Sequence, residues 1–431
     1  MKTILVAFVF FAFYLNSAGQ NSIHYTTENS PLPSNRIQSI FIDQNNNKWI
    51  GTDKGLVLFD NINWTVYGTA DKLSSENISD IVFDLTSYGP EAWLATPAGV
   101  SAVAFDADGI TSATYYTSSN SGLNEDSITA ISVDSSHNRW FGTSRYLSSF
   151  TGNAWKSTDL DGFLQKYPVM SISSGIDSWN FIGTKGGGVA RVKRDEVDGI
   201  TSASAYDTDW SGLLSNNIYT SYIDEDGNQW YGTDMGAAFH EGTNTKSGWS
   251  TWESSDSTLI NNFVQVIKGD NNNGIWFGTP SGASYYAGGK WSSYTVDEGL
   301  ISNNILDIEI DNNGFVWFAT DKGISVFNDI TSIEKYNRVT RKSLLKIYPN
   351  PETDKFTIEY KLTKPGVVKI QLVNVQSMVE EIFYTGFKPE GRHTETLDLN
   401  KGRIVNGIYY VRINAGLYIY TQKIVIINSL N

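Results

Sequence analysis

The sequence predicts an all-β protein: a seven-bladed β-propeller closed by its N-terminal strand, followed by a small C-terminal β-sandwich. The main observation is a short segment, an aromatic residue followed by x-Gly/Ala-Thr, which recurs along most of the chain. Its aromatic residue stands at positions 49, 93, 140, 181, 230, 276 and 317, so the spacing runs from 41 residues (140 to 181) to 49 residues (181 to 230). A strand-rich repeat of about 45 residues is typical of propeller blades.

Each repeat reads as four short strands. An alternating apolar strand ends on an Asp and a Gly/Asn turn, as at 305–314, and the aromatic strand follows. A Thr-x-x-Gly turn leads to a third strand, and the fourth strand often carries its own Trp, namely Trp64, Trp155, Trp252 or Trp291. Short runs with period-two alternation between turn residues predict hairpin-connected strands. The Gly after the aromatic residue is expected to leave room for close approach between sheets.

The propeller region, residues 22–329, begins and ends with incomplete repeats. Segment 23–27 resembles the fourth strand at 64–67 but has no first three strands before it. The last repeat stops after its third strand, at Phe327. We therefore expect the N-terminal strand to complete the seventh blade.

Blades two and four share the segment Asp-Gly-Ile-Thr-Ser-Ala, at 108–113 and 198–203. In both blades it stands at the hairpin between the third and fourth strands and replaces the usual Trp strand. Duplication of a pair of blades explains the repetition.

Composition places the chain among globular proteins with a core, because 40 % of its residues are hydrophobic and only 18 % are charged. The absence of cysteine excludes disulfides and cysteine-based metal or redox sites. The formal net charge of −14 comes without a basic stripe, which argues against a nucleic-acid partner.

Residues 1–19 have the pattern of a signal peptide. Lys2 precedes an apolar core at 4–15, and small residues at 17–19 offer a cleavage site before Gln20. An apolar core of about 12 residues is too short to span a bilayer, which takes roughly 20. We expect a mature protein that leaves the cytoplasm and has no transmembrane segment.

Residues 330–343 read as a linker and residues 344–431 as a second domain. The linker mixes Lys, Arg, Asn and Ser without clear periodicity, and all 13 Trp residues precede it. The tail predicts strands at 355–360, 367–374, 380–384, 393–399, 407–414 and 418–427. Evenly spaced short strands with turn residues between them favour a β-sandwich.

The repeats resemble those of the two-component regulator propeller family, found in sensor ectodomains of Bacteroidetes. That family combines a Leu-Pro/Ser-x-Asn-x-Ile start, an Asp-x-x-Gly-x-x-Trp turn and a Trp-x-Gly-Thr-x-x-Gly core. This chain shows the start at 32–37 and the turn and core from Asp43 to Thr52, and the resemblance covers roughly 300 residues. The sensors continue into a membrane helix and a kinase. Nothing similar is present here, so signalling is not implied.

The tail resembles the type A C-terminal sorting domain of the type IX secretion system. The resemblance rests on Val368–Asn374, on Lys423–Ile426 and on a sorting motif made of Tyr348, Pro349, Asn350, Pro351, Gly407 and Tyr409. It implies the type IX secretion machinery as a partner and export across the outer membrane. Removal of the tail, with release or surface attachment of the protein, is implied as well. The alternative is a carbohydrate-binding sandwich.

We expect any ligand to bind where the turns between second and third strands and the loops between blades gather around the channel. These segments supply Asp53, Lys54, Arg145, Tyr146, Tyr167, Lys185, Asp234, Asp321 and Lys322, together with Asn77, Asn216, Asn217, Asn262, Asn303 and Asn304. Amides, carboxylates and exposed aromatic rings suit a sugar. Arg145 and Tyr146 stand out because blade three alone breaks its Thr-x-x-Gly turn there. The Asn residues recur from blade to blade, so turn-stabilising Asx hydrogen bonds are their alternative role.

No metal or cofactor is expected. The histidines, His24, His137, His240 and His393, stand on different elements and pair with no nucleophile in the sequence pattern. The segment from Asp224 to Asn228 resembles a calcium loop but lacks the Glu that completes one, so a hairpin turn explains it. The Gly-rich run 185–188 precedes no helix, unlike a phosphate-binding loop.

Three classes of function remain open. The first is a non-catalytic secreted or surface binding protein that recognises a glycan. The second is a surface scaffold for protein–protein interaction. The third is a propeller-type polysaccharide lyase using Tyr146, Tyr167, Lys185 or Arg145. Since the histidines do not lie in the turns and loops named above, we do not expect an enzyme, and fold alone does not decide.

Overall fold

The computed structural model describes residues 22–328 with gaps at 87–88, 107–108, 153, 176–178, 196–198, 225, 242–246, 256–258 and 271–272. In the tail it describes residues 345–348, 355–362, 366–374, 379–389, 391–398, 407–415 and 418–426. The predicted signal peptide (1–19) and linker (330–343) lie outside the described residues. The chain divides into two compact units, Met1–Asn328 and Asp329–Asn431, each considered by itself.

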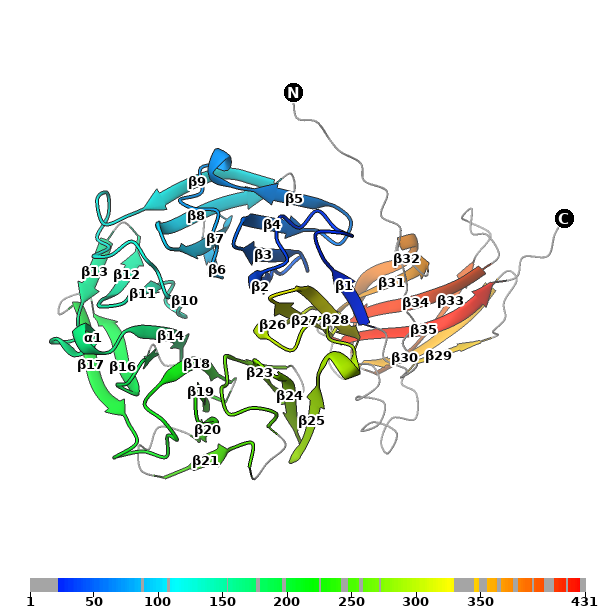
Figure 1. Cartoon of the computed structure of the whole chain (residues 1–431). Coiled ribbons are helices and arrows are strands. Elements are labelled where there is room, and N and C mark those ends of the chain that lie inside the picture. The colour runs from blue at the N-terminus through cyan, green and yellow to red at the C-terminus, as the bar shows by residue number, and fades with distance from the viewer. Residues whose placement is uncertain are drawn as a thin grey trace. The chain divides into compact units, whose positions relative to one another are not determined.

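The first unit is a ring of seven antiparallel four-stranded sheets, which we number as blades 1 to 7 (Figure 1). Blades 1 and 2 contain β2 (Ile37–Ile42), β3 (Lys48–Thr52), β4 (Gly55–Phe59), β5 (Trp64–Tyr67), β6 (Asp80–Thr86), β7 (Gly89–Thr96), β8 (Gly99–Asp106) and β9 (Gly109–Tyr116). Blades 3 and 4 contain β10 (Ala130–Val133), β11 (Arg139–Gly142), β12 (Leu147–Thr151), β13 (Ala154–Thr158), β14 (Val169–Ser174), β15 (Asn180–Thr184), β16 (Val189–Asp195) and β17 (Gly199–Tyr206).

The remaining blades follow the same order. Blades 5 and 6 contain β18 (Ile218–Ile223), β19 (Gln229–Thr233), β20 (Ala237–His240), β21 (Trp249–Trp252), β22 (Val266–Gly269), β23 (Ile275–Thr279), β24 (Gly282–Ala287) and β25 (Lys290–Tyr294). Blade 7 contains β26 (Ile305–Ile310), β27 (Phe315–Thr320), β28 (Gly323–Asn328) and β1 (Ser22–Tyr25). Short helices α1 (Phe163–Lys166), η1 (Thr69–Asp71) and η2 (Val296–Glu298) lie in loops between blades.

The ring is closed by its N-terminal strand, as the sequence predicted. β1 pairs antiparallel with β28, from Ser22 opposite Phe327 to Tyr25 opposite Ile324. The first strands of neighbouring blades contact one another around the centre, and the fourth strands lie outside (Figure 1). Chain ends that are distant in sequence are thus joined within one sheet.

The Asp of the repeated turn fixes the hairpin between the first and second strands. Asp134 Oδ1 accepts hydrogen bonds from the backbone N–H of Ser136 (2.9 Å) and Asn138 (3.0 Å). Its Oδ2 accepts one from Trp140 Nε1 at 2.8 Å. The same Asp-to-Trp contact recurs at Asp43, Asp224 and Asp311. One carboxylate therefore holds both the turn and the buried indole six residues later, which explains their fixed spacing.

The Gly after the aromatic residue faces the first strand of the next blade. A Cβ on Gly142 would lie 2.3 Å from Val169 Cγ1, and one on Gly278 would lie 2.7 Å from Ile305 Cγ2. The predicted close approach between sheets is therefore confirmed. The neighbouring group is a branched side chain, so a methyl group in this place has to displace it.

Replacing Gly142 with Ala is expected to lower the free energy of unfolding by about 1–3 kcal/mol, the usual cost of overpacking a core. Chemical denaturation of the two proteins measures the difference. Ala95 occupies the same slot in blade 2, so Ala95→Gly removes a methyl group without a clash and serves as the control. Equal stability of Gly142→Ala and the original protein would show that the blades can separate at no cost.

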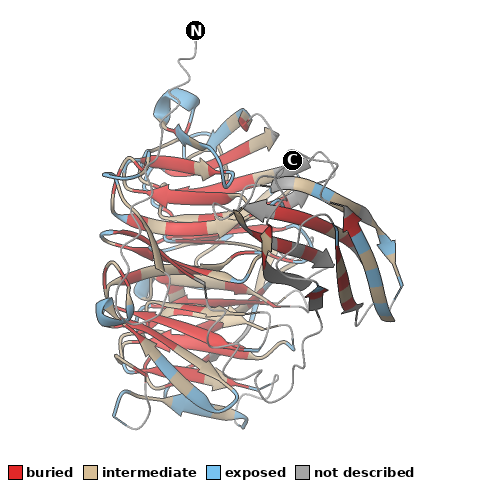
Figure 2. Cartoon of the chain, turned by 90° about the vertical axis from the view of Figure 1, so that its right-hand side faces the viewer, coloured by how far each residue is buried: buried red, intermediate tan, exposed pale blue. Residues whose placement is uncertain are grey.

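Many residues on the strands of the blades are buried (Figure 2), and the large side chains among them form cores shared by neighbouring blades. The outer-strand tryptophans Trp64 and Trp155 pack back onto the cores that their blades share with the preceding blades. In blades 2 and 4, Ile110 and Ile200 of the repeated Gly-Ile-Thr-Ser segment take this position. The segment thus replaces an aromatic anchor by an aliphatic one on a longer hairpin.

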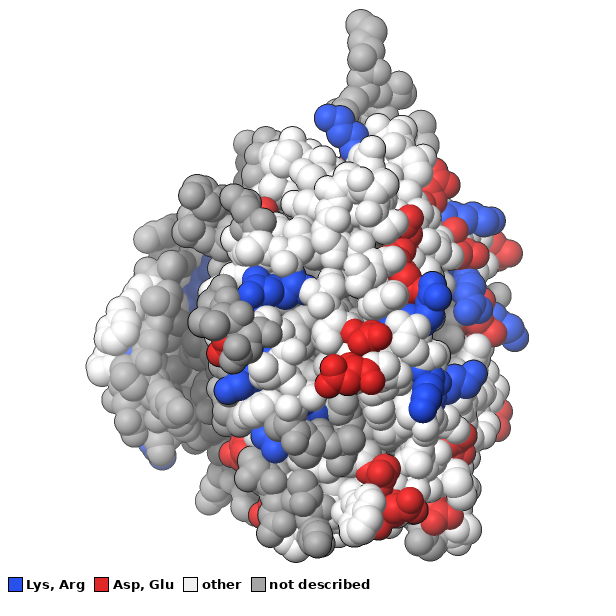
Figure 3. Space-filling model, turned by 90° about the vertical axis from the view of Figure 1, so that its left-hand side faces the viewer, with Lys and Arg blue, Asp and Glu red and all other residues white. Residues whose placement is uncertain are grey.

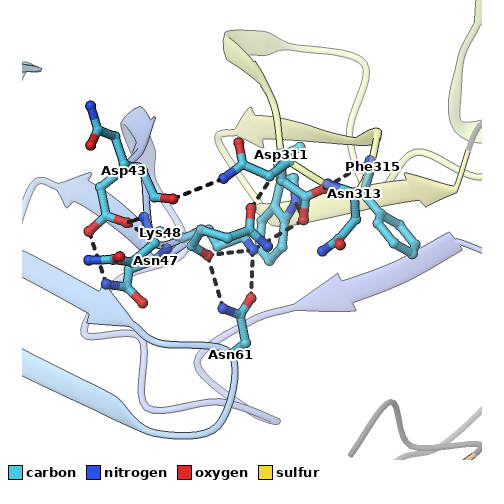
Figure 4. Close-up of polar contacts among 12 residues, drawn as sticks. Asp43, Asn47, Lys48, Asn61, Asp311, Asn313 and Phe315 are labelled. Atoms are coloured by element: carbon cyan, nitrogen blue, oxygen red, sulfur yellow. Dashed lines mark hydrogen bonds and ion pairs between the residues drawn. The ribbon is translucent and has the colours of Figure 1, made fainter. Parts of the chain in front are cut away.

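A buried ion pair joins blade 7 to blade 1 where the ring closes (Figure 4). Lys48 Nζ lies 3.1 Å from Asp311 Oδ2, and the two side chains are 1 % and 3 % exposed. Nζ also donates to the carbonyl of Asn46 (2.9 Å) and to Asn61 Oδ1 (2.6 Å). Each charge of this pair therefore faces the opposite charge across the seam, and Lys48 has further partners in the adjacent turns.

The second unit is a sandwich of two sheets, ordered β29-β30-β33 and β32-β31-β34-β35. Its strands are β29 (Leu345–Tyr348), β30 (Lys355–Leu362), β31 (Gly366–Asn374), β32 (Val379–Lys388), β33 (Gly391–Asp398), β34 (Gly407–Ala415) and β35 (Tyr418–Ile426). Both sheets contribute to one core, for example through Phe356 and Val411. The six strands expected from the sequence are present, and β29 is an additional one.

Candidate functional site

The turns between second and third strands contact the loops that lead into the next blade, so both lie on one face of the ring. The N–H of Gly55 donates to the carbonyl of Glu76 at 2.6 Å, and that of Gly186 donates to the carbonyl of Asn216 at 3.0 Å. The N–H of Val264 donates to the carbonyl of Thr233 at 2.9 Å. We call these segments the turn-and-loop face; all predicted ligand-binding residues stand on it.

Most of the recurring Asn residues of this face serve the loops themselves. Among the described residues, five equivalent side-chain oxygens accept a hydrogen bond of 2.6–2.9 Å from a backbone N–H seven or eight residues earlier, and they belong to Asn35, Asp126, Asn216, Asn262 and Asn303. Asn77 and Asn304 accept from Gln38 and Gln265 of a neighbouring blade. The alternative role of these residues, as stabilisers of turns, is thus the one the geometry supports.

Arg145 is tied to an acid of its own blade. Its Nε and Nη2 both lie 2.5 Å from Glu125 Oε1, although the Arg145 side chain is 56 % exposed. Burial opposes the charge on Glu125, but hydrogen bonds from Thr143, Arg145 and Ser144 outweigh it and lower the pKa of Glu125. Tyr146 is half-buried and its carbonyl accepts from Thr143 Oγ1, so the turn persists without its Gly. A ligand at Arg145 has to compete with Glu125.

The predicted residues of blades 1 and 7 stand apart from those of blades 3 to 5. Asp321 Oδ1 accepts a hydrogen bond from Ser302 Oγ at 2.6 Å, and Lys322 beside it is exposed. In the same place of blade 1, Asp53 Oδ1 is buried and meets no donor among the described residues, and Lys54 is exposed.

Blades 4 and 5 bring three predicted residues together. The ring of Tyr167 lies against the turn that follows Lys185, where a Cβ on Gly187 would come within 2.7 Å of it. Lys185 pairs with Asn217 in an isolated β-bridge, and Asn217 Nδ2 donates to Asp234 Oδ2 at 2.8 Å. The other carboxylate oxygen, Asp234 Oδ1, is buried and accepts no hydrogen bond from a described residue.

Two aromatic residues that the sequence analysis did not select extend this cluster. Tyr219, two residues after Asn217, makes an edge-to-face contact with Phe263 of the next blade at 4.5 Å between ring centroids. Burial and the charge of Asp234 raise the pKa of Tyr219. Aligning the first strands identifies the position, since Gln38 and Gln265 occupy it in blades 1 and 6. We name Tyr167, Lys185, Asn217, Tyr219, Asp234 and Phe263 the blade-5 cluster.

Charged residues also lie on the first strands, between the blades. Asp307 Oδ2 accepts from the N–H of Ile40 in blade 1 at 2.7 Å, and Lys268 forms an ion pair with Glu309. Burial, reinforced by the charge of Glu309, raises the pKa of Asp307 to about 8. Burial raises the pKa of Asp80, at the equivalent place in blade 2, to about 6. The sequence analysis did not select these groups because nothing local marks a side chain that faces another blade.

The histidines occupy separate environments. His24 Nδ1 lies 3.2 Å from Ser325 Oγ, so a histidine does contact a serine hydroxyl, which the sequence analysis did not predict. Ser325 is fully buried, however, and its Oγ accepts a hydrogen bond from the N–H of Ile301. His137 pairs with Asp84, and His240 is buried against Trp249. Across the described part of the chain, no group of three or more His, Cys, Asp or Glu side chains is placed to hold a metal ion.

The side of the ring near α1 carries cationic and anionic residues next to one another, separated by uncharged areas (Figure 3). A ligand on this side meets short-range polar contacts and not a field of one sign. Within the described residues, no helix is long and apolar enough to cross a membrane.

The described part of the predicted sorting motif divides between surface and core. Tyr348 is 45 % exposed, and its hydroxyl donates to Glu359 Oε1 at 2.5 Å. Gly407 opens β34, and Tyr409 is buried in the core of the sandwich. Pro349, Asn350 and Pro351 lie outside the described residues.

Comparison with known proteins finds a family model that matches part of each unit. Residues 346–427 match the family model of the secretion system C-terminal sorting domain, and residues 299–322 match that of the two component regulator propeller. No curated protein matches the chain. PorZ, a surface component of the type-IX secretion system of Porphyromonas gingivalis, has a similar structure, with a TM-score of 0.55 and 15 % identity over 92 % of this chain. This chain spans 60 % of the PorZ chain.

Two further structures share the propeller fold. A streptogramin B lyase matches 72 % of this chain and 97 % of its own with a TM-score of 0.54 and 13 % identity. The WD40 propeller domain of Doa1 matches 73 % of this chain and 99 % of its own with a TM-score of 0.51 and 12 % identity. At these identities the likeness concerns the fold alone. The chain carries a two component regulator propeller repeat and a type IX secretion C-terminal sorting domain, which directs it across the outer membrane to the outside of the cell.

Proposed function

We propose that the propeller is a non-catalytic binding protein that recognises a glycan through the blade-5 cluster. The observation that carries the proposal is the continuous contact from Tyr167 and Lys185 through Asn217 to Asp234, with Tyr219 and Phe263 beside it. Aromatic rings stack on the apolar faces of sugars, while amides and carboxylates bind vicinal hydroxyl groups.

The free oxygen of Asp234 supports a polar ligand at this place. A buried carboxylate oxygen without a donor is unfavourable, and a sugar hydroxyl group donates the hydrogen bond that it lacks. Asp234 and the equivalent Asp321 of blade 7 each accept one hydrogen bond, from Asn217 and from Ser302, but of the two only Asp234 has a second oxygen that is buried without a donor among the described residues. The two blades share the same turn, so they differ in whether the Asp of that turn has a buried carboxylate oxygen without a hydrogen bond.

The raised pKa of Tyr219 favours a binding role for this side chain over a role as a catalytic base. A lyase needs a tyrosine or histidine that releases its proton near neutral pH. Burial and the charge of Asp234 act in the opposite direction at Tyr219, because both disfavour a phenolate. Tyr219 is therefore suited to donate a hydrogen bond and to stack against a ligand.

A glycan array of the secreted full chain tests the proposal, with Asp234→Asn, Tyr219→Ala and the matched control Asp321→Asn. We expect Asp234→Asn and Tyr219→Ala to weaken binding of the same glycan by about tenfold or more, the usual effect of losing a hydrogen bond to a charged group. Asp321→Asn and Arg145→Ala should bind as the original protein does. An array without any signal contradicts the proposal and shifts the search to a surface protein partner.

The same experiment separates a binding protein from an enzyme. The bound polymer is incubated with the protein, and its size distribution is followed. A binding protein leaves the distribution unchanged, whereas shorter products that disappear in Tyr219→Ala would assign a lyase activity to this cluster.

A further inference from the structure

Trp210 is the one tryptophan among the described residues that is exposed, with 69 % of its side chain accessible. It stands in the turn Asp207–Ser211, which leads from β17 toward the first strand of blade 5. A tryptophan on the surface leaves a large apolar area in water, and tryptophan is enriched among the residues that contribute most to binding.

Two other loops of the ring contain the same turn and show what its fourth residue ordinarily does. The turns at 26–30 and 117–121 close through Ser30 and Ser121, whose N–H and Oγ donate to the first carbonyl of the turn, as those of Ser211 do. Their fourth residues are Asn29 and Asn120. Each accepts from the N–H of the first residue, at 2.8 and 2.7 Å, and donates to an earlier carbonyl.

In the turn Asp207–Ser211, the first residue and not the fourth stabilises the turn. Asp207 Oδ1 accepts hydrogen bonds from the N–H groups of Asp209 and Trp210, each at 3.0 Å. The turn is therefore fixed from its first position, and the side chain of Trp210 takes no part in stabilising it. Its exposure is not explained by the fold of the loop.

The turn is joined directly to the blade-5 cluster. The N–H of Thr208 donates to Asn216 Oδ1 at 2.9 Å, and the carbonyl of Asn216 accepts from Gly186 and Gly188. Asn216 precedes Asn217, and Gly186 follows Lys185, so both neighbours belong to the cluster. The loop carrying Trp210 and the cluster thus share one hydrogen-bonded frame.

We infer that Trp210 is a second aromatic platform of this face, so that the ligand is an extended oligosaccharide reaching from Tyr219, on the first strand of blade 5, to Trp210, in the loop after the outer strand of blade 4. The inference rests on the proposed glycan binding. Tyr219 and Phe263 form one platform, Asp234 and Asn217 beside it provide hydrogen bonds, and the indole of Trp210 stacks on a sugar unit farther along the oligosaccharide. A short fragment reaches only one of the two platforms.

Titration of the full chain with oligosaccharides of increasing length, cut from the glycan that the array identifies, tests the inference. Trp210→Ala should weaken binding of the longest oligosaccharide about 3- to 10-fold and leave binding of the disaccharide unchanged, as expected for the loss of one stacking contact. Trp210→Tyr should retain most of the affinity. Because Asp207 holds the turn, the melting temperature of Trp210→Ala should stay that of the original protein.

Ile62→Ala is the matched control, since Ile62 is an exposed apolar residue, 80 % accessible, on the β4–β5 hairpin. Equal affinity of Trp210→Ala for every length, together with loss of binding in Tyr219→Ala, overturns the extended site and leaves the proposed function intact. Failure of the original protein to bind any glycan overturns both.

Discussion

Replacing Lys48 with Met is expected to lower the free energy of unfolding of the propeller by about 3–5 kcal/mol, because it leaves Asp311 buried without its counter-charge. The carboxylate lies at the seam between blades 7 and 1, where it also accepts from Trp317 Nε1 and from the N–H groups of Asn313 and Phe315 (Figure 4). It cannot turn toward water without breaking the hairpin of blade 7. Denaturation in urea, followed by tryptophan fluorescence, measures the change.

Two companion proteins separate the loss of the ion pair from a general effect of removing a lysine. Lys54→Met removes an exposed lysine of the same blade and should change stability by less than about 1 kcal/mol. Lys48→Met combined with Asp311→Asn removes both charges and should recover part of the loss, since a buried neutral pair costs less than one unpaired charge. If Lys48→Met is as stable as Lys54→Met, the seam is not held by this pair.

The parts of the fold that the sequence predicts are those encoded by contacts within one hairpin. Asp134 reaches Trp140 across a single turn, and Thr143 closes the following turn on Tyr146. The Asp-to-Trp contact repeats at the same spacing at Asp43, Asp224 and Asp311, so the pattern is visible without a structure. Ring closure was equally predictable, because two incomplete repeats together make one blade.

What the sequence does not reveal are the contacts between blades. Lys48 and Asp311 are more than 250 residues apart, so no local pattern links them, although Arg139, the residue before Trp140, pairs with Asp84 of the preceding blade in the same way. The residues of the candidate site also come from different blades and are distant in the sequence. Tyr167, Lys185 and Asp234 were three of nine predicted ligand-binding residues, among which the sequence singled out Arg145 and Tyr146. The contacts through Asn217 and the turn after Lys185 are what bring the first three together. Trp210 is recognised only when its turn is compared with the two others that carry Asn.

Asp307 should make the propeller less stable as the pH rises from 6 to 8. Its pKa is raised from 3.8 to about 8, so the folded state holds a proton that the unfolded chain has already released above pH 4. A raised pKa contributes stability that is complete below the unfolded value and is lost as the pH rises toward the folded value. Asp80 also makes the propeller less stable as the pH rises, but its effect ends near pH 6. Burial lowers the pKa of His24, so this group makes the propeller more stable as the pH rises, and it does so only below about pH 7.

Of these three groups, Asp307 alone acts across the whole interval from pH 6 to 8. One proton bound by the folded state alone corresponds to about 1.4 kcal/mol per pH unit, so the original protein should lose on the order of 2–3 kcal/mol across this interval. Asp307→Asn is neutral at every pH and its amide oxygen still accepts from Ile40, so its stability should stay nearly constant. Asp80→Asn should keep the slope of the original protein above pH 6. A slope that persists in Asp307→Asn would mean that another group between the blades holds the proton, and Glu309, which faces Lys268, is the next to replace.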